Sequence, residues 1–149
     1  HIGALIGARH SHLDNAGYSI DQKRISSQEA SPDRLVEALL AEERWRQVLS
    51  SLVVCFFARG IYQVDVVLRA LNVAGFSLTE KDLKSIAGEI HREKYRFKIR
   101  EGFSFEGLDV PRRVLDTATP LGRLDDEYIK SAVKHFAGLM AHRAREQDL

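Results

Sequence analysis

SPDRLVEALLAEERWRQVLSSLVVCFFARG, residues 31–60, carries both a helix start signal and a long helical pattern of apolar residues. Its opening serine can cap free backbone amides, the proline suits the first helical position, and the aspartate favours the positive end of the helix dipole. Apolar residues then recur at approximately helical spacing, namely Leu35, Leu39, Trp45, Leu49, Leu52 and Phe56. The pattern predicts a helix that begins at the surface, with a polar face made of Glu42, Glu43, Arg44 and Arg46. It then becomes buried over residues 52–58, until Gly60 stops or bends it.

Two more helices are predicted after this stretch. Residues 64–73 fit a short helix that Gly75 ends. Thr79, followed three residues later by Asp82, resembles a capping box and starts a longer helix, which Gly102 can end. The inward positions are Val67, Leu68 and Leu71 in the first helix, and Leu83, Ile86, Ala87 and Ile90 in the second.

The remaining segments predict one further helix and two irregular regions. Residues 107–122 contain two prolines and two terminal glycines, which favours an irregular connection. Asp125 then caps a last helix, whose apolar face consists of Ile129, Val133, Phe136 and Met140. Residues 1–31 lack clear helical periodicity, although a short helix near the start fits them. No alternating strand pattern of useful length occurs, so the predicted fold class is all-α, with four to five helices.

Composition restricts the classes of partner. The chain has 149 residues, with 44% hydrophobic and 29% charged, which indicates an ordered core. Lys plus Arg number 22 against 21 Asp plus Glu, so we expect neither nucleic acid nor an anionic membrane as a partner. The longest apolar run, residues 52–58, is far below the roughly 20 residues of a membrane helix. A single cysteine, Cys55, excludes an intramolecular disulfide and fits a reducing, cytoplasmic location.

The order of residues after position 77 carries a family resemblance. Residues 78–114 read LTEKDLKSIAGEIHREKYRFKIREGFSFEGLDVPRRV. This segment resembles the C-terminal region of aldehyde ferredoxin oxidoreductases, with its Gly-Glu-Arg-Ile, Phe-Asn-x-Arg-Glu-Gly-Phe and Leu-Pro-x-Arg patterns. The matching residues are Gly88, Glu89, Ile90, Phe97, Arg100, Glu101, Gly102, Phe103, Pro111 and Arg113. Lys98 replaces the asparagine and Val110 replaces the leucine.

A second resemblance surrounds the cysteine. Residues 50–57 are similar to the family segment Asp-x-x-Gly-Leu-Cys-x-Phe, in which Ser50, Val53 and Val54 take the places of Asp, Gly and Leu. The resemblance implies that Cys55 is the fourth ligand of a 4Fe-4S cluster. It also implies that Ser50, Val53 and Val54 face a pterin of the tungsten cofactor.

A third resemblance lies near the start of the chain. Residues 7–13 resemble the family stretch Arg-Gly-x-x-His-Leu, with the pair His12-Leu13 in register. The resemblance places this pair near the substrate end of the cofactor. His12 is therefore the candidate catalytic residue, because an imidazole can transfer protons near neutral pH.

The resemblance implies a larger parent enzyme. Residues 1–149 would form its C-terminal helical domain, and an N-terminal cofactor-binding domain would supply three more cysteines. The intact parent would hold a tungsten (or molybdenum) bis-pterin and a 4Fe-4S cluster, oxidise aldehyde-like substrates and pass electrons to ferredoxin. Alone, the chain is expected to be inactive and to hold no cofactor, because one thiolate cannot retain a cluster.

Simpler interpretations remain open from the residues themselves. Cys55 could be a buried small hydrophobe, as its apolar neighbours favour, and His10 and His12 could be surface or structural histidines. The basic residues 92–100 are interrupted by acidic ones, which is typical of a solvated helix face. The rival function is a non-catalytic helical module that binds a protein partner, with residues 53–57 exposed.

Overall fold

The structure is a computed structural model that describes residues 2–9, 11, 15, 16, 20, 31–118, 123 and 125–145. Its elements are α1 (Ile2–Ile6), α3 (Pro32–Ser51), the 3-10 turn η2 (Phe56–Ala58), α4 (Val64–Val73), α5 (Glu80–Arg100), α6 (Arg112–Asp116) and α7 (Asp126–Arg145). Within this described part there are six α-helices and no strand, which confirms the all-α prediction. None of these helices combines the length and apolar character that a membrane span requires.

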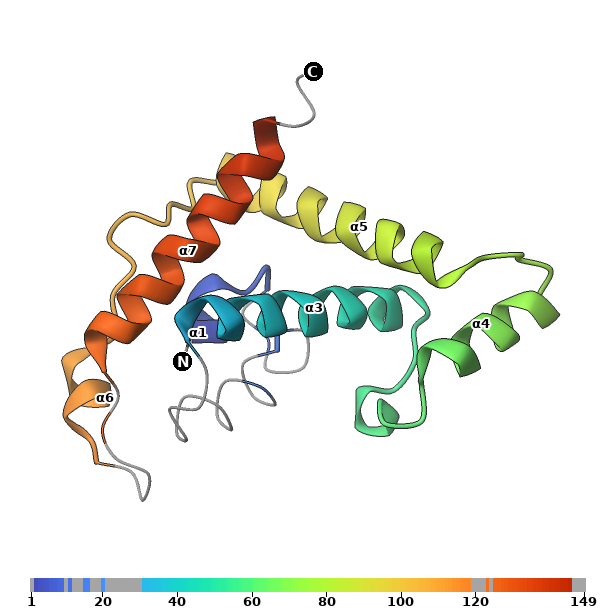
Figure 1. Ribbon diagram of the computed structural model, residues 1–149, viewed down its shortest axis with the longest axis horizontal. Helices are drawn as coiled ribbons and strands as arrows, with labels where there is room; N and C mark the ends of the chain where they lie inside the picture. The colour runs from blue at the N-terminus through green and yellow to red at the C-terminus, as the bar shows by residue number, and fades with distance from the viewer. Residues whose placement is uncertain are drawn as a thin grey trace.

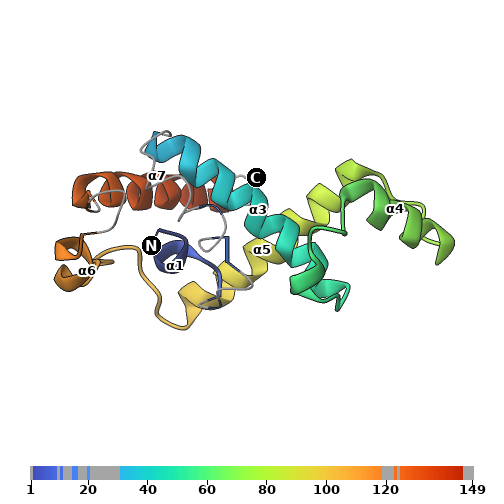
Figure 2. The ribbon, with the colours of Figure 1, turned by 90° about the horizontal axis from the view of Figure 1, so that it is seen from below.

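Helix α3 is the centre of the arrangement (Figure 1). It packs against α5, which runs beside it in the opposite direction, and against α7, while α1 also packs on α7. Viewed from below, α4 lies at one end of an elongated molecule and α6 at the other (Figure 2). Because α3 and α5 extend between these ends, they join the two halves of the fold.

Two hydrophobic clusters stabilise the fold. The larger one joins α1, the first half of α3, the end of α5 and α7, and includes Leu35, Leu39, Tyr95 and Phe136. The smaller one joins the end of α3 to α4 and the start of α5, through Val48, Leu49, Val67, Leu83 and Ala87. The first half of α3 is therefore buried, which makes the predicted order, surface first and core last, wrong.

The start of α3 agrees with the sequence, but its end does not. The Ser31 side chain accepts a hydrogen bond from the Arg34 amide at 3.4 Å, and a proline follows in the first turn. The helix stops at Ser51, well before Gly60. Its last carbonyls accept hydrogen bonds from the Val53 and Val54 amides, at 3.1 and 3.4 Å, in the pattern of a Schellman motif. This motif usually has glycine at the position that Val53 occupies here, so the sequence gives no signal that the helix ends.

Helices α4 and α5 have the predicted bounds. Both end in the same hydrogen-bonded motif, with Gly75 and Gly102 at φ +92°. At the start of α5, the Thr79 side chain accepts a hydrogen bond from the Asp82 amide at 3.2 Å, and the Asp82 side chain accepts one from the Thr79 amide at 2.8 Å. The predicted capping box is therefore confirmed.

The buried faces of α3 and α5 contain more polar groups than predicted. Ile86 is exposed, and the inward row of α5 continues from Leu83 and Ala87 through His91 and Tyr95. On α3, the predicted polar face contains buried Glu43 and Arg46. These groups are tolerated because they meet partners inside the protein, as described below.

The C-terminal part is closer to prediction. The irregular connection over residues 107–122 contains the short helix α6 in its described portion, which the prediction missed. Helix α7 follows Asp125, whose side chain accepts a hydrogen bond from the Glu127 amide at 3.0 Å. Ile129, Val133 and Phe136 are buried and Met140 is partly buried, so the predicted apolar face is confirmed.

Candidate functional site

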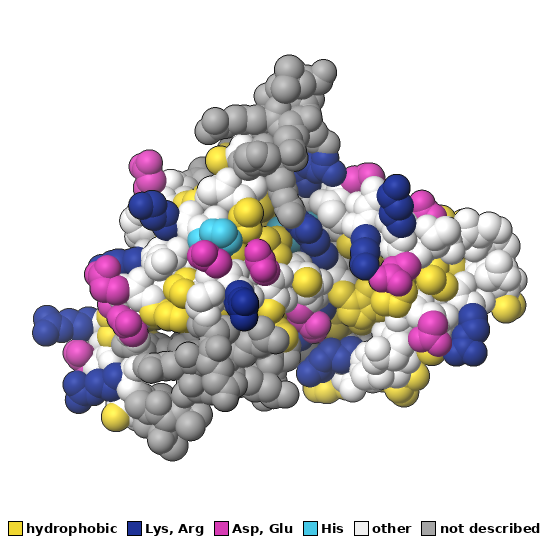
Figure 3. Space-filling view, in the orientation of Figure 1, with side chains coloured by type: hydrophobic (Ala, Val, Ile, Leu, Met, Phe, Trp, Pro, Cys, Tyr) yellow, Lys and Arg dark blue, Asp and Glu magenta, His cyan; other side chains and the backbone are white. Residues whose placement is uncertain are grey.

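The end of α3 and the residues that follow it form a surface segment, residues 50–57, here called the Cys55 loop. Val53 is 90% exposed and Phe57 is 85% exposed, and Cys55 between them is exposed as well. In the space-filling view, hydrophobic side chains reach the surface around the end of α3 and the η2 turn (Figure 3). The prediction that residues 52–58 are buried is therefore wrong at Val53, Cys55 and Phe57.

Val53 has an unusual backbone conformation. Its φ is +57°, the only positive φ at a non-glycine residue among those described. A β-branched residue is strained in this left-handed region, whereas glycine adopts it freely. The resemblance expects glycine at this position, so the backbone conformation supports the alignment of the Cys55 loop with the family segment.

The geometry at Cys55 suits a ligand better than a core residue. Its backbone is extended, at φ −74° and ψ 119°, and it directly precedes η2. Because the thiol is exposed, the interpretation of Cys55 as a buried hydrophobe is wrong. Across the described residues no three His, Cys, Asp or Glu side chains come together as a metal-binding group. Iron–sulfur clusters are usually held by four ligands, and Cys55 can supply one of them at most.

The other residues of the Cys55 loop provide mostly apolar surface. Ser50 and Val54 are half-buried, and Val54 packs against the smaller hydrophobic cluster. Ile61, just beyond η2, is 66% exposed. No carboxylate occupies position 50, so the loop can offer a pterin a hydroxyl, backbone groups and apolar contacts.

A groove of about 1050 Å³ lies elsewhere, along α5. Its walls come from the C-terminal half of α5 and from Ala8 and Arg9, which follow α1. The lining residues of α5 and the turn after it are Glu89, Ile90, Glu93, Lys94, Phe97, Lys98, Glu101, Gly102 and Phe103. Many of them belong to the segment that carries the strongest resemblance, so that segment forms one face of the groove.

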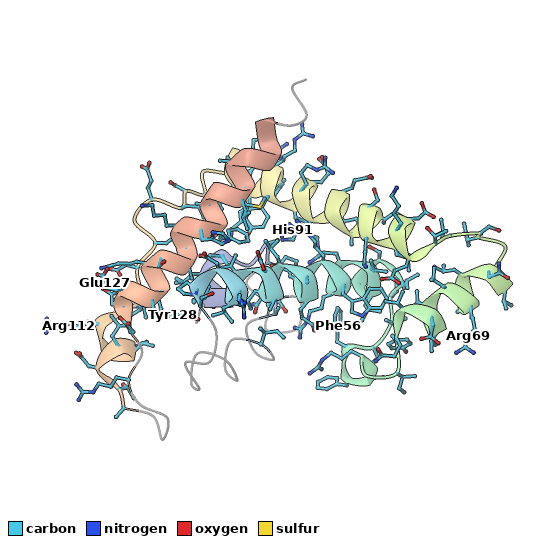
Figure 4. The ribbon with its side chains drawn as sticks, in the orientation of Figure 1. Phe56, Arg69, His91, Arg112, Glu127 and Tyr128 are labelled. Atoms are coloured by element: carbon cyan, nitrogen blue, oxygen red, sulfur yellow. The ribbon has the colours of Figure 1, made fainter. Side chains whose placement is uncertain are left out.

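Charged groups lie beneath this groove, between α3 and α5. The Glu43 carboxylate on α3 is 3.5 Å from Nε2 of His91 on α5, and both side chains are almost fully buried. Figure 4 shows His91 on the side of α5 that faces α3. Lys98 is half-buried, and this burial lowers its pKa, an effect that the negative charge of Glu43 opposes. Sequence analysis missed these residues because nothing in the pattern distinguishes them from a solvated face.

His12, the candidate catalytic residue, lies outside the described residues, as does His10. The structure describes residues 7–9, which precede them and reach the groove. The groove and the Cys55 loop share no lining residue, so they are two separate surfaces of the described structure.

The fold and site define a multihelical domain whose single thiol lies on an apolar surface loop. The family model described as aldehyde ferredoxin oxidoreductase, domains 2 & 3, matches residues 4–140. The chain belongs to the aldehyde ferredoxin oxidoreductase family. Searches of curated proteins and of solved structures return no match. The family supports a larger parent of the aldehyde ferredoxin oxidoreductase type.

Proposed function

We propose that residues 1–149 form the C-terminal helical domain of a cytoplasmic tungsten- or molybdenum-pterin oxidoreductase. The parent enzyme oxidises aldehyde-like substrates and passes the electrons to ferredoxin. The observation that carries the proposal is the exposed Cys55 thiol, which follows a left-handed residue at the family's glycine position. The match of residues 4–140 to the family model for domains 2 & 3 supports the proposal.

In this proposal Cys55 is one ligand of a 4Fe-4S cluster, and an N-terminal cofactor-binding domain supplies the other three cysteines. Ser50, Val53 and Val54 form the wall that faces the pterin. When bound, the bis-pterin metal centre and the cluster supply the redox chemistry, and the protein positions them. The chain's own contribution is a thiolate, an apolar surface that excludes water, and a fixed loop.

His12 is proposed as the proton-transfer residue. It follows the groove-lining residues Ala8 and Arg9 in the chain, and an imidazole both accepts and donates protons near neutral pH. The proposal for His12 rests on the family's His-Leu pair, not on an observed geometry.

The ligand role is tested by Cys55→Ser in the full-length protein. We expect depleted or destabilised cluster, because a hydroxyl is a much poorer iron ligand than a thiolate. Iron content, visible absorbance and reduction potential are measured beside Ser51→Ala, a change at an exposed neighbour in the Cys55 loop. Unchanged cluster content and potential in the Cys55 variant would remove the ligand role.

The proton-transfer role is tested by His12→Ala, with His10→Ala as the matched control. Turnover should fall by about 10²–10⁴-fold in the first variant and stay near wild type in the second, with cofactor content nearly intact in both. The reverse result would transfer the role to His10.

The exposed side chains of Val53 and Phe57 also favour a second candidate, a non-catalytic module that binds a protein partner. The parent reading frame separates the two. Three further cysteines and a pterin-binding domain upstream support the oxidoreductase, and their absence supports the interaction module.

A further inference from the structure

A single peptide group near the start of the chain is held by two opposite charges. The Ala8 amide donates a hydrogen bond to Oε1 of Glu43 at 2.7 Å. The Gly7 carbonyl accepts one from Nζ of Lys98, also at 2.7 Å. These two backbone groups belong to the same peptide bond. A carboxylate of α3 and an ammonium of α5 therefore form hydrogen bonds with its two opposite ends.

Both charged groups are themselves fixed. Glu43 is 3% exposed, and its other oxygen lies 3.5 Å from Nε2 of His91. The Lys98 ammonium lies 3.8 Å from the ring centroid of Phe103 and 5.6 Å from that of Tyr95. Hydrogen bonds to charged groups are stronger than neutral ones, and desolvation strengthens them further. Both charged groups therefore have further partners that hold them beside the peptide.

Packing at Gly7 restricts the same peptide group. A Cβ added there would lie 2.6 Å from the Gly3 carbonyl oxygen and 2.8 Å from Cβ of Asn15. The first of these contacts is with backbone, which cannot move aside easily. The close approach of the chain at this point requires glycine.

We propose that Glu43 and Lys98 are positioning residues that clamp the Gly7–Ala8 peptide against α3 and α5. The clamp holds the peptide next to the groove-lining residues Ala8 and Arg9, and His12 follows Ala8 by four positions in the chain. Its catalytic consequence rests on the proposed role of His12. Its structural part rests on the two hydrogen bonds alone.

Hydrogen exchange of the Ala8 amide in the full-length protein tests the clamp directly. Glu43→Leu and Lys98→Met should each speed exchange by about 10- to 100-fold, because each removes a charged hydrogen-bond partner. Glu43→Gln should keep part of the protection, since its amide oxygen still accepts. Glu37→Leu and Lys84→Met, changes at exposed positions of the same helices, should leave exchange unchanged. Wild-type exchange in Lys98→Met and Glu43→Leu, or equal acceleration in the controls, overturns the clamp.

A double-mutant cycle tests its catalytic consequence. Lys98→Met should lower kcat per bound cofactor by about tenfold with little change in KM, because a misplaced catalytic group slows the reaction. In a His12→Ala background the same change should have no further effect. If Lys98→Met lowers kcat equally in the wild-type and His12→Ala backgrounds, Lys98 has a structural role only and does not position His12. Wild-type turnover in His12→Ala would refute the proposed role of His12, whereas unchanged exchange would refute the clamp alone.

Discussion

Val53→Gly should stabilise the protein, which is an unusual result for a glycine substitution. Val53 has φ +57°, and the left-handed conformation costs an L-residue about 1–2 kcal/mol. Its side chain is 90% exposed, so removing it forfeits almost no buried surface. Glycine adds about 0.5–1 kcal/mol of backbone entropy to the unfolded chain. The difference predicts a net gain of about 0.5–1 kcal/mol in the free energy of unfolding.

Urea unfolding followed by circular dichroism measures this gain as a rise in midpoint of about 0.3–0.5 M. Val73→Gly is the matched control. Val73 is also 90% exposed, but it lies in the last turn of α4, where its backbone is helical. There glycine should destabilise by a few tenths up to about 1 kcal/mol. If both variants lose stability equally, Val53 is not strained, and the argument that aligns it with the family glycine fails.

Three further predictions concern the core, the cap and the cofactors. Tyr95→Phe should stabilise by about 1 kcal/mol at neutral pH, because the buried hydroxyl has no hydrogen-bond partner among the described residues. Burial, together with the negative charge of Glu43, raises the pKa of Tyr95 in the folded protein. Above about pH 10 only the unfolded tyrosine ionises, so the wild type should lose stability there. Thermal unfolding should then show a difference in Tm between the wild type and Tyr95→Phe that grows with pH. Thr79→Ala should cost about 1 kcal/mol. The hydrogen bonds from Thr79 lower the pKa of Asp82, so its carboxylate stabilises the folded protein above the ordinary carboxyl pKa of 3.8. Urea unfolding at decreasing pH should show this stabilisation disappear as the pH falls below 3.8 and through the pKa of the folded protein. The isolated chain should be colourless and free of iron and tungsten by metal analysis, and about four irons per monomer would contradict this.

Local signals were sufficient for most helix boundaries. Serine followed by proline, a capping box and two glycines at helix ends each act through hydrogen bonds within a few residues, so the sequence exposes them directly. The end of α3 uses the same motif as α4 and α5 but places Val53 at the position that usually holds glycine. A valine carries no stop signal, and the helix was therefore predicted to continue to Gly60.

The candidate site was predictable only where a resemblance supplied the residues. Cys55 is one thiol in an apolar run, and its pattern alone favours a buried position. Glu43 and Lys98 were indistinguishable from surface charges, because their partners are backbone groups of residues 7 and 8, many positions away in sequence. Long-range pairing of this kind leaves no period in the sequence.

The early end of α3 is what brings the thiol to the surface. In a helix that continued to Gly60, residue 55 would lie seven positions after Val48 and share its face, because seven residues make about two turns. Val48 is 4% exposed and packs in the smaller hydrophobic cluster, so Cys55 would have been buried beside it. The left-handed turn at Val53 instead reverses the chain and leaves Cys55 exposed. The left-handed backbone at Val53 lies two residues before the candidate ligand, at a position where the resemblance expects glycine. Val53→Gly therefore tests the alignment of the candidate site as well as the fold.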